Sequence, residues 1–284
     1  MRMLGNTVMP DLLQSIIQWE KEIAPEVPYL DTPTGFYLTF NENDNGGYRC
    51  SPVDSIMFAD TGYDGIHYSL LTDFGRVTNL NEAPVIRVSP MDFGNCVRMV
   101  AKNIRDFFTL HFFGHEGLLL LDFESKEEYL HYLQSQDDAQ ASEHFDREKW
   151  DRERAIVREE AVKAFNLERI EDGFGYVQEL QAQRKKDSVL KTLDGLGIVP
   201  LGEREEAKEY IPHPWRRIDF SDVDLNELKA FVHNAEMETL LAFIRDFQLQ
   251  YFNHSEVMQL LYNRLDLYGF HLEAKRLLYC MDVS

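Results

Sequence analysis

The chain has 284 residues, of which 44% are hydrophobic, and 49 acidic against 29 basic residues give it a formal net charge of −20. A chain of this length can bury a large core without disulfides or a structural metal. Its three cysteines, Cys50, Cys96 and Cys280, are too widely spaced for a CxxC or zinc motif. The charge argues against a nucleic-acid partner, because such binding needs a concentrated basic patch. It favours solubility or a cationic partner.

No segment has the pattern of a targeting or membrane-spanning sequence. The amino-terminal residues lack the continuous apolar run of a signal peptide. The longest aliphatic run, "LLLL" at 118–121, is far shorter than the roughly 20 residues that a membrane span needs. We therefore expect a cytoplasmic protein with no membrane partner.

Short β-like segments dominate the first third of the chain. The segments "GFYLTF" (35–40) and "GYRCS" (47–51) flank a polar loop, as the strands of a hairpin would. Further segments with strand composition follow at 54–59, 66–72 and 83–90. Several short strands at this spacing predict an antiparallel meander.

A helical pattern follows the last predicted strand. In "NCVRMVAKNIRDFFTL" (95–110), the apolar residues fall on one face of a helix. These residues are Val97, Val100, Ala101, Ile104, Phe107 and Phe108. We expect this helix to cover one side of the sheet, which makes the fold class α+β.

The rest of the chain is helical in pattern. The polar stretch 134–144 is a candidate linker, and 145–170 is highly charged with a narrow apolar stripe. Glycines and a proline interrupt the pattern at 194–202, and about four helices follow residue 221. The predicted organisation is an α+β domain (1–133), a charged helical connector (134–220) and an all-α C-terminal helical bundle (221–284).

Two short motifs resemble metal-binding sequences but lack the partners that such sites need. "DFG" (73–75) holds magnesium in protein kinases, but the glycine-rich loop, strand lysine and catalytic loop of a kinase are absent. "NENDNG" (41–46) spaces its polar residues like a calcium loop, but Pro52 stands where the bidentate glutamate belongs. Both motifs are therefore predicted to be turns.

The remaining candidates for chemistry are two histidines and two glycine-rich segments. His111 and His115 are four residues apart, a spacing that can share a metal on a helix. The HExxH order is absent and neighbouring glycines indicate a helix end, so we expect ordinary surface or helix-terminal histidines. "GFGYVQE" and "GLGIVPLG" lack the third glycine of a dinucleotide loop. We predict no metal, no cofactor and no enzymatic activity.

The stretch "FADTGYDGIHYSLLT" (58–72) is the most distinctive in the chain. Gly62 and Gly65 can adopt positive φ, and Asp64 can hydrogen-bond to its own backbone, so "TGYDG" predicts a tight turn before a strand. An aromatic side chain beside a charge on a protruding turn is typical of protein-contact residues. We therefore predict Tyr63, Asp64, His67 and Tyr68 as the protein-binding residues.

This stretch, followed by "APVIRVSP" and "VAKNIRDFF", resembles the SUKH superfamily, whose best-known branch is the Smi/Knr family of cell-wall synthesis regulators. The resemblance covers about residues 54–110. The helix that usually opens the family is not plain in residues 1–50. The resemblance implies a non-enzymatic, α+β protein-binding module. Bacterial members are commonly immunity proteins that neutralise toxins, many of them nucleases, and fungal members are scaffolds in cell-wall signalling.

The leading hypothesis is therefore an immunity protein with a basic toxin domain as its partner. A regulatory scaffold, in which the helical half recruits a separate partner, is the first alternative. A hydrolase whose carboxylates or histidines come together only in the fold is the second.

Overall fold

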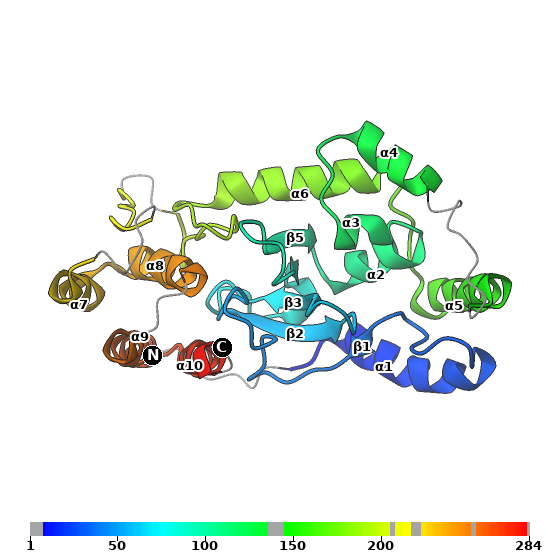
Figure 1. Ribbon diagram of the computed structural model, residues 1–284, viewed down its shortest axis with the longest axis horizontal. Coiled ribbons are helices and arrows are strands. Elements are labelled where there is room, and N and C mark those ends of the chain that lie inside the picture. The colour runs from blue at the N-terminus through cyan, green and yellow to red at the C-terminus, as the bar shows by residue number, and fades with distance from the viewer. Residues whose placement is uncertain (1–7, 136–144, 205–207, 217–222, 251–253, 283–284) are drawn as a thin grey trace.

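A computed structural model describes residues 8–135, 145–204, 208–216, 223–250 and 254–282. Its centre is a five-stranded antiparallel sheet packed with helices, and an all-helical region follows it, which confirms the predicted α+β class (Figure 1). The strands are β1 (Tyr37–Leu38), β2 (Ser55–Asp60), β3 (His67–Leu71), β4 (Val85–Val88) and β5 (Val97–Ala101). Each strand pairs with the next one along the chain, so the sheet is a meander.

Helices cover both faces of the sheet. They are α1 (Asp11–Ile23), α2 (Ile104–Phe112), α3 (Glu116–Leu120), α4 (Lys126–Ser135), α5 (Arg147–Phe165) and α6 (Gly173–Asp187). One face, which includes Tyr68 and Leu70, shares a core with α1, α2 and α5. The other face, which includes Leu71 and Ile86, packs with Leu196 and with Leu180 of α6. Strand β3 is therefore buried on both sides.

Two of the predicted elements are wrong. Residues 47–51 do not form a strand. Strand β1 pairs directly with β2, and residues 41–54 between them form an irregular loop. The predicted 95–110 helix is in fact a strand followed by a helix. Residues 97–101 form β5, and α2 starts only after Asn103, whose side chain accepts a hydrogen bond from the Asp106 backbone at 2.9 Å. That cap satisfies one of the first free N–H groups of the helix and fixes its beginning.

The helical segments around the sheet also differ from expectation. Helix α1 was not predicted, yet it buries Leu13, Ile16 and Ile23. The segment expected to act as a connector belongs to the main core, because Val157 and Ala161 of α5 are buried there with Val177 of α6. The candidate linker lies almost entirely outside the described residues.

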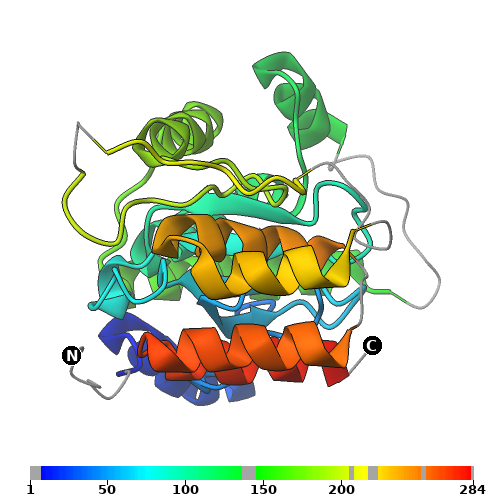
Figure 2. The same ribbon diagram turned by 90° about the vertical axis from the view of Figure 1, so that its left-hand side faces the viewer.

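The C-terminal region consists of α7 (Leu225–Asn234), α8 (Met237–Leu249), α9 (Ser255–Leu267) and α10 (His271–Asp282). These helices lie together at one end of the molecule (Figure 2). Phe243, Phe247 and Leu261 are fully buried in a second apolar core between them. In the part of the chain that the structure describes, no helix combines the length and apolar character needed to cross a membrane.

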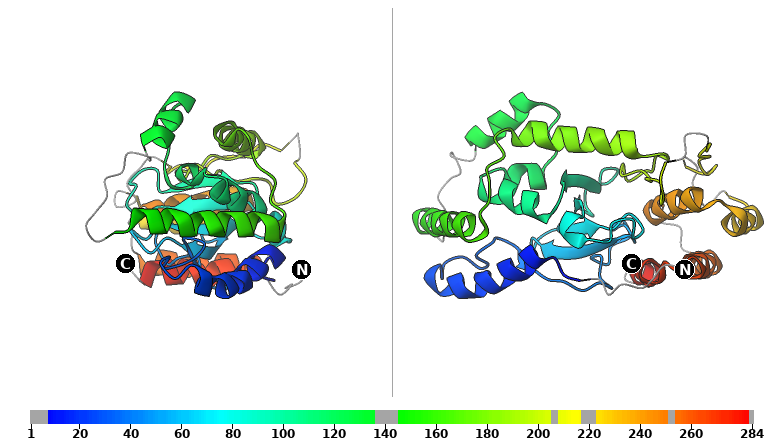
Figure 3. Two further views of the ribbon diagram at one scale, coloured as in Figure 1. Left: turned by 90° about the vertical axis from the view of Figure 1, so that its right-hand side faces the viewer. Right: turned by 180° about the vertical axis from the view of Figure 1, so that it is seen from behind.

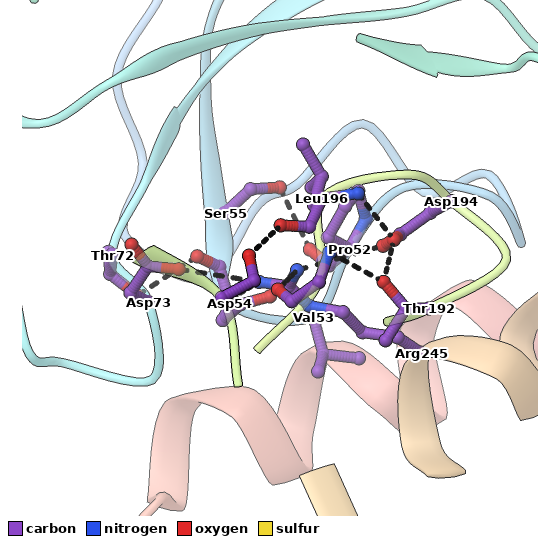
Figure 4. Close-up of polar contacts among 12 residues, drawn as sticks. Pro52, Val53, Asp54, Ser55, Thr72, Asp73, Thr192, Asp194, Leu196 and Arg245 are labelled. Atoms are coloured by element: carbon purple, nitrogen blue, oxygen red, sulfur yellow. Dashed lines mark hydrogen bonds and ion pairs between the residues drawn. The ribbon is translucent and has the colours of Figure 1, made fainter. Parts of the chain in front are cut away.

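Buried ion pairs join this helical region to the sheet. Arg245 of α8 donates hydrogen bonds to Asp54 at 2.5 Å and to the Gly197 carbonyl at 2.8 Å. Asp73 and Asp194 also lie around this guanidinium, at 3.6 and 3.8 Å (Figure 4). Burial opposes the charge on Arg245, but the three carboxylates outweigh burial and raise its pKa.

The "DFG" segment belongs to this junction. Asp73, Phe74 and Gly75 all have positive φ, which confirms the predicted turn. Both carboxylate oxygens of Asp73 accept hydrogen bonds from Arg184 of α6, at 2.6 and 2.7 Å. The motif therefore anchors α6 to the sheet through a bidentate ion pair.

Candidate functional site

The turn between β2 and β3 has the geometry expected from its sequence. The Thr61 N–H donates to the Ile66 carbonyl at 3.1 Å, and the Ile66 N–H donates to the Tyr63 carbonyl at 3.1 Å. Gly62, Asp64 and Gly65 have φ values of 79°, 52° and 67°. Only glycine adopts such values without cost, so the two glycines are required where they stand.

The four predicted contact residues separate into two pairs. Tyr63 is 50% exposed and Asp64 is also exposed, as a binding role requires. His67 and Tyr68 are both 0% exposed, so their predicted place on an outer contact surface is wrong. The reason is that β3 is flanked by β2 and β4 and covered on both faces, which sequence alternation alone does not reveal.

His67 instead supports the neighbouring loop. Its Nδ1 lies 2.8 Å from the Gly65 carbonyl, and its Nε2 lies 3.2 Å from both the Ser51 hydroxyl and the Asn45 carbonyl. A Cβ on Gly46 would lie 2.3 Å from this imidazole, so the loop backbone passes directly over the ring. Burial lowers the pKa of His67.

Two further tyrosines flank the turn. A Cβ on Gly62 would lie 2.6 Å from the Tyr37 ring, and a Cβ on Gly65 would lie 2.4 Å from the Tyr48 hydroxyl. Both rings are partly exposed, as is Tyr63 between them. We call Tyr37, Tyr48, Tyr63 and Asp64 the tyrosine patch. Sequence reasoning missed Tyr37 and Tyr48, because the contacts that place them join separate segments of the chain.

A cavity of about 370 Å³ opens beside this patch. Tyr37 and Tyr63 belong to the tyrosine patch and also line the cavity. The other walls come from the loop that precedes β1, from α2 and α3, and from α5, which lies across this end of the molecule (Figure 3). The lining includes Asp31, Thr34, Phe36, Tyr68, His111, Phe112, Glu116, Leu120, Trp150, Arg154 and Arg158.

Glu116 is the charged centre of the cavity wall. Its Oε1 accepts hydrogen bonds from Arg154 at 2.6 Å and from Arg158 at 2.9 Å. Burial opposes its ionisation, but His111 and the two arginines outweigh burial and lower the pKa of Glu116. Its second oxygen, Oε2, is buried without a hydrogen-bond partner. Glu116 is thus an ionised acceptor with one oxygen unused.

His111 and Tyr68 are close to each other in the same wall. The Phe36 ring lies 4.6 Å from the His111 ring and 5.4 Å from the Tyr68 ring. Burial lowers the pKa of His111 to about 4, and it raises the pKa of Tyr68. Both side chains are therefore neutral at pH 7. The Nδ1 of His111 and the hydroxyl of Tyr68 are buried without a hydrogen-bond partner.

The two histidines that could have shared a metal have separate surroundings. His111 lies in the last turn of α2, as a helix-terminal histidine would, but it is buried and not at the surface. His115 lies just before α3, as a helix-terminal histidine would, and bonds to the Tyr129 hydroxyl at 2.7 Å and the Ile170 carbonyl at 3.1 Å. Within the described ranges, no three His, Cys, Asp or Glu side chains gather as metal ligands would.

No protein-family model matches the chain, and no curated protein matches it. The tyrosine patch and the adjoining cavity therefore carry the functional argument.

Proposed function

We propose that this chain is a non-enzymatic protein-binding module of the SUKH type, and that it acts as an immunity protein that neutralises a toxin. The observation that carries the proposal is the tyrosine patch. Three partly exposed tyrosines surround a turn whose backbone is fixed by Gly62 and Gly65. Rigid exposed tyrosines are enriched among the residues that dominate protein–protein binding energy.

The order of elements supports the family resemblance. The β2–β3 hairpin carries "TGYDG", β4 carries the "PVIRV" segment, and α2 follows β5. Helix α1 supplies a helix ahead of the sheet, which is how the family usually opens. A helix at this place supports the resemblance outside residues 54–110.

The charge of the chain defines the partner's chemistry. Asp31 lies beside Tyr37, Asp60 precedes the turn and Asp64 lies within it, in a chain of net charge −20. Such a surface attracts a basic protein and repels nucleic acid. A nuclease toxin must bind phosphates, so its active face is basic. Docking there would block the nuclease without imitating its substrate.

A regulatory scaffold is the second candidate, and the C-terminal helices favour it. The α7–α10 region has its own core and exposes Leu267, Tyr268 and Tyr279. A scaffold would use this second surface for a separate partner. Loss of the partner by variants in this region, and not by variants in the tyrosine patch, would favour the scaffold.

The direct test is affinity purification of the tagged chain from its native host, followed by mass spectrometry. We expect a basic protein that is lost, or bound at least about tenfold more weakly, with Tyr63→Ala or Asp64→Ala. Tyr268→Ala, a partly exposed tyrosine at the other end of the molecule, is the matched control. Retention of the partner by both patch variants would refute the proposed contact site.

The salt dependence of association tests the electrostatic part. Steering by opposite charge should raise the association rate about 10- to 1,000-fold at low ionic strength. Near 0.15 M salt the Debye length is about 8 Å, so distant charges are screened while the dissociation rate changes little. An acidic partner, or an association rate indifferent to salt in stopped-flow measurements, would contradict the proposed charge complementarity.

A further inference from the structure

Three buried polar atoms without hydrogen-bond partners belong to residues that line the same cavity. They are the Tyr68 hydroxyl, the His111 Nδ1 and the Glu116 Oε2, and they come from β3, α2 and α3. Folded proteins pair nearly all such groups, because each buried unpaired group costs about 1–3 kcal/mol. The residues that carry these three atoms come from separate elements and line one cavity, so a ligand bound there can supply a partner that the fold leaves missing.

The chemistry of the three atoms defines what that ligand must offer. A hydrogen bond to the Thr34 backbone raises the pKa of His111, so a ring N–H is directed at that backbone, and Nδ1 is the nitrogen without a partner. With the hydrogen on the other nitrogen, the neutral ring offers Nδ1 as an acceptor. The ionised Glu116 also only accepts, and the Tyr68 hydroxyl can accept or donate. The ligand must therefore bring N–H or O–H donors.

The cavity walls define the remaining properties of the ligand. The side chains of Phe36, Phe112 and Trp150, with those of Tyr37 and Tyr63, give the cavity an aromatic lining. The formal charges of the lining cancel, because it holds two carboxylates, Asp31 and Glu116, and two guanidinium groups, Arg154 and Arg158. A charged ligand would lose its hydration without gaining a net opposite charge. The volume of about 370 Å³ lies within the range of small-molecule sites.

We propose that this cavity binds a small, neutral aromatic molecule whose ring carries an N–H donor, the chemical class of the indoles. The ring stacks between the aromatic side chains, and its single N–H group donates to one of the unpartnered acceptors, Glu116 Oε2 or His111 Nδ1. Tyr37 and Tyr63 belong to both the patch and the cavity, but this proposal does not rest on the proposed protein contact. Indole binding is measured on the chain alone, so its failure would leave the protein contact standing.

The test is ¹⁹F NMR of 5-fluoroindole titrated with the purified full-length chain. We expect line broadening that saturates, and at least about fivefold weaker binding of 5-fluoro-1-methylindole, in which a methyl group replaces the donor hydrogen. Equal binding of the two probes would overturn the donor requirement, and no broadening with either would overturn the site. Tighter binding of N-acetyl-tryptophan amide than of indole would assign the cavity to a peptide and contradict the small-molecule proposal.

Variants locate the binding. Leu120→Trp should fill the cavity and abolish the broadening. Tyr68→Phe removes one unpartnered hydroxyl and should weaken binding at least about threefold. Tyr262→Phe, a half-buried tyrosine in α9, is the control and should bind like the parent chain. Thermal unfolding confirms that each variant is folded, and unchanged binding by both Leu120→Trp and Tyr68→Phe would refute this location.

Discussion

The two ends of the molecule both bury charged side chains, but in different ways. At the junction with α7–α10, Arg245 pairs with Asp54 and Arg184 pairs with Asp73, so ion pairs join distant segments, and the atoms left without a hydrogen-bond partner are Asp54 Oδ1, Asp194 Oδ2 and Arg245 Nε. At the other end, Glu116 also pairs through one oxygen only, but the residues with unpartnered atoms, Tyr68, His111 and Glu116, line a cavity.

This difference separates a structural role from a binding role. Charge pairs buried between segments fix how those segments dock, and removing one partner leaves an uncompensated charge. An unpartnered atom beside a cavity contributes nothing to docking, and under the proposal a ligand that bonds to it recovers the cost of its burial. The "DFG" motif lies at the junction with α7–α10, whereas no known sequence motif marks the residues around the cavity.

The largest effect is expected from Arg245→Ala. This change leaves Asp54 and Asp194 buried without their guanidinium, so the free energy of unfolding should fall by about 3–5 kcal/mol. Urea denaturation measures it. Lys229→Ala, which breaks an exposed pair with Glu256, is the control and should change stability by less than about 1 kcal/mol. Similar losses for the two variants would mean that the junction is not held by its buried charges.

The second-largest effect is a loss of folding stability at low pH, caused by His111 in the cavity wall. The pKa of His111 is about 4 in the folded chain, below the ordinary value of 6.5, mainly because of burial. The unfolded chain therefore binds a proton that the folded chain does not, and stability falls as pH drops from 6.5 to 4. The loss is on the order of 3 kcal/mol.

His111→Phe isolates this contribution, because burial also lowers the pKa values of His67 and His115. Unfolding free energies of the parent chain and the variant should diverge with pH between 6.5 and 4 and run parallel above pH 7. Glu116, Arg154 and Arg158 face His111 and are present in both chains. Parallel curves across the whole range would show that His111 is not held neutral by burial.

The sequence predicts the sheet better than it predicts the site. Turn residues such as Gly62, Gly65 and Asp73 act locally, so the meander and its turns follow from the pattern. The helix pattern at 95–110 misled, because the apolar spacing from Val97 to Ala101 satisfies a strand as well as a helix until the Asn103 cap intervenes.

The cavity could not be predicted from the sequence. Tyr68 and His111 both contact the ring of Phe36, which lies more than 30 positions before Tyr68 in the chain. Arg154 and Arg158 reach Glu116 from a helix that sequence reasoning assigned to a connector. The spacing of residues within one helix or strand does not predict these contacts, because each contact joins separate elements.

The third prediction compares two glycines with positive φ. Alanine at Gly65 and at Gly94 should each cost about 1 kcal/mol or more of stability through backbone strain. Only at Gly65 would the new Cβ meet the Tyr48 side chain, whereas Gly94 has open space. Gly65→Ala should therefore displace Tyr48 and weaken partner binding, while Gly94→Ala should not, as measured by co-purification. Equal partner binding by the two variants would show that Tyr48 does not contribute to the contact with the partner.

The smallest loss of stability is expected from Tyr68→Phe. Its hydroxyl is buried with no hydrogen-bond partner to lose, so its removal should cost no stability and should raise the free energy of unfolding by up to about 1–3 kcal/mol. Tyr176→Phe is the contrasting variant, because the Tyr176 hydroxyl donates to Asp106 at 2.7 Å and should cost about 1 kcal/mol or more. A large loss for Tyr68→Phe in urea denaturation would mean that its hydroxyl stabilises the fold.

The most direct test of the contrast between the two ends is an amide chemical-shift map of the full chain during titration with indole. We expect the shifts to concentrate around Tyr68, His111 and Glu116, in β3, α2 and α3, and α7–α10 to stay unchanged. Shifts centred on Asp54 and Arg245, or no saturable shift at all, would contradict the assignment of binding to the cavity end.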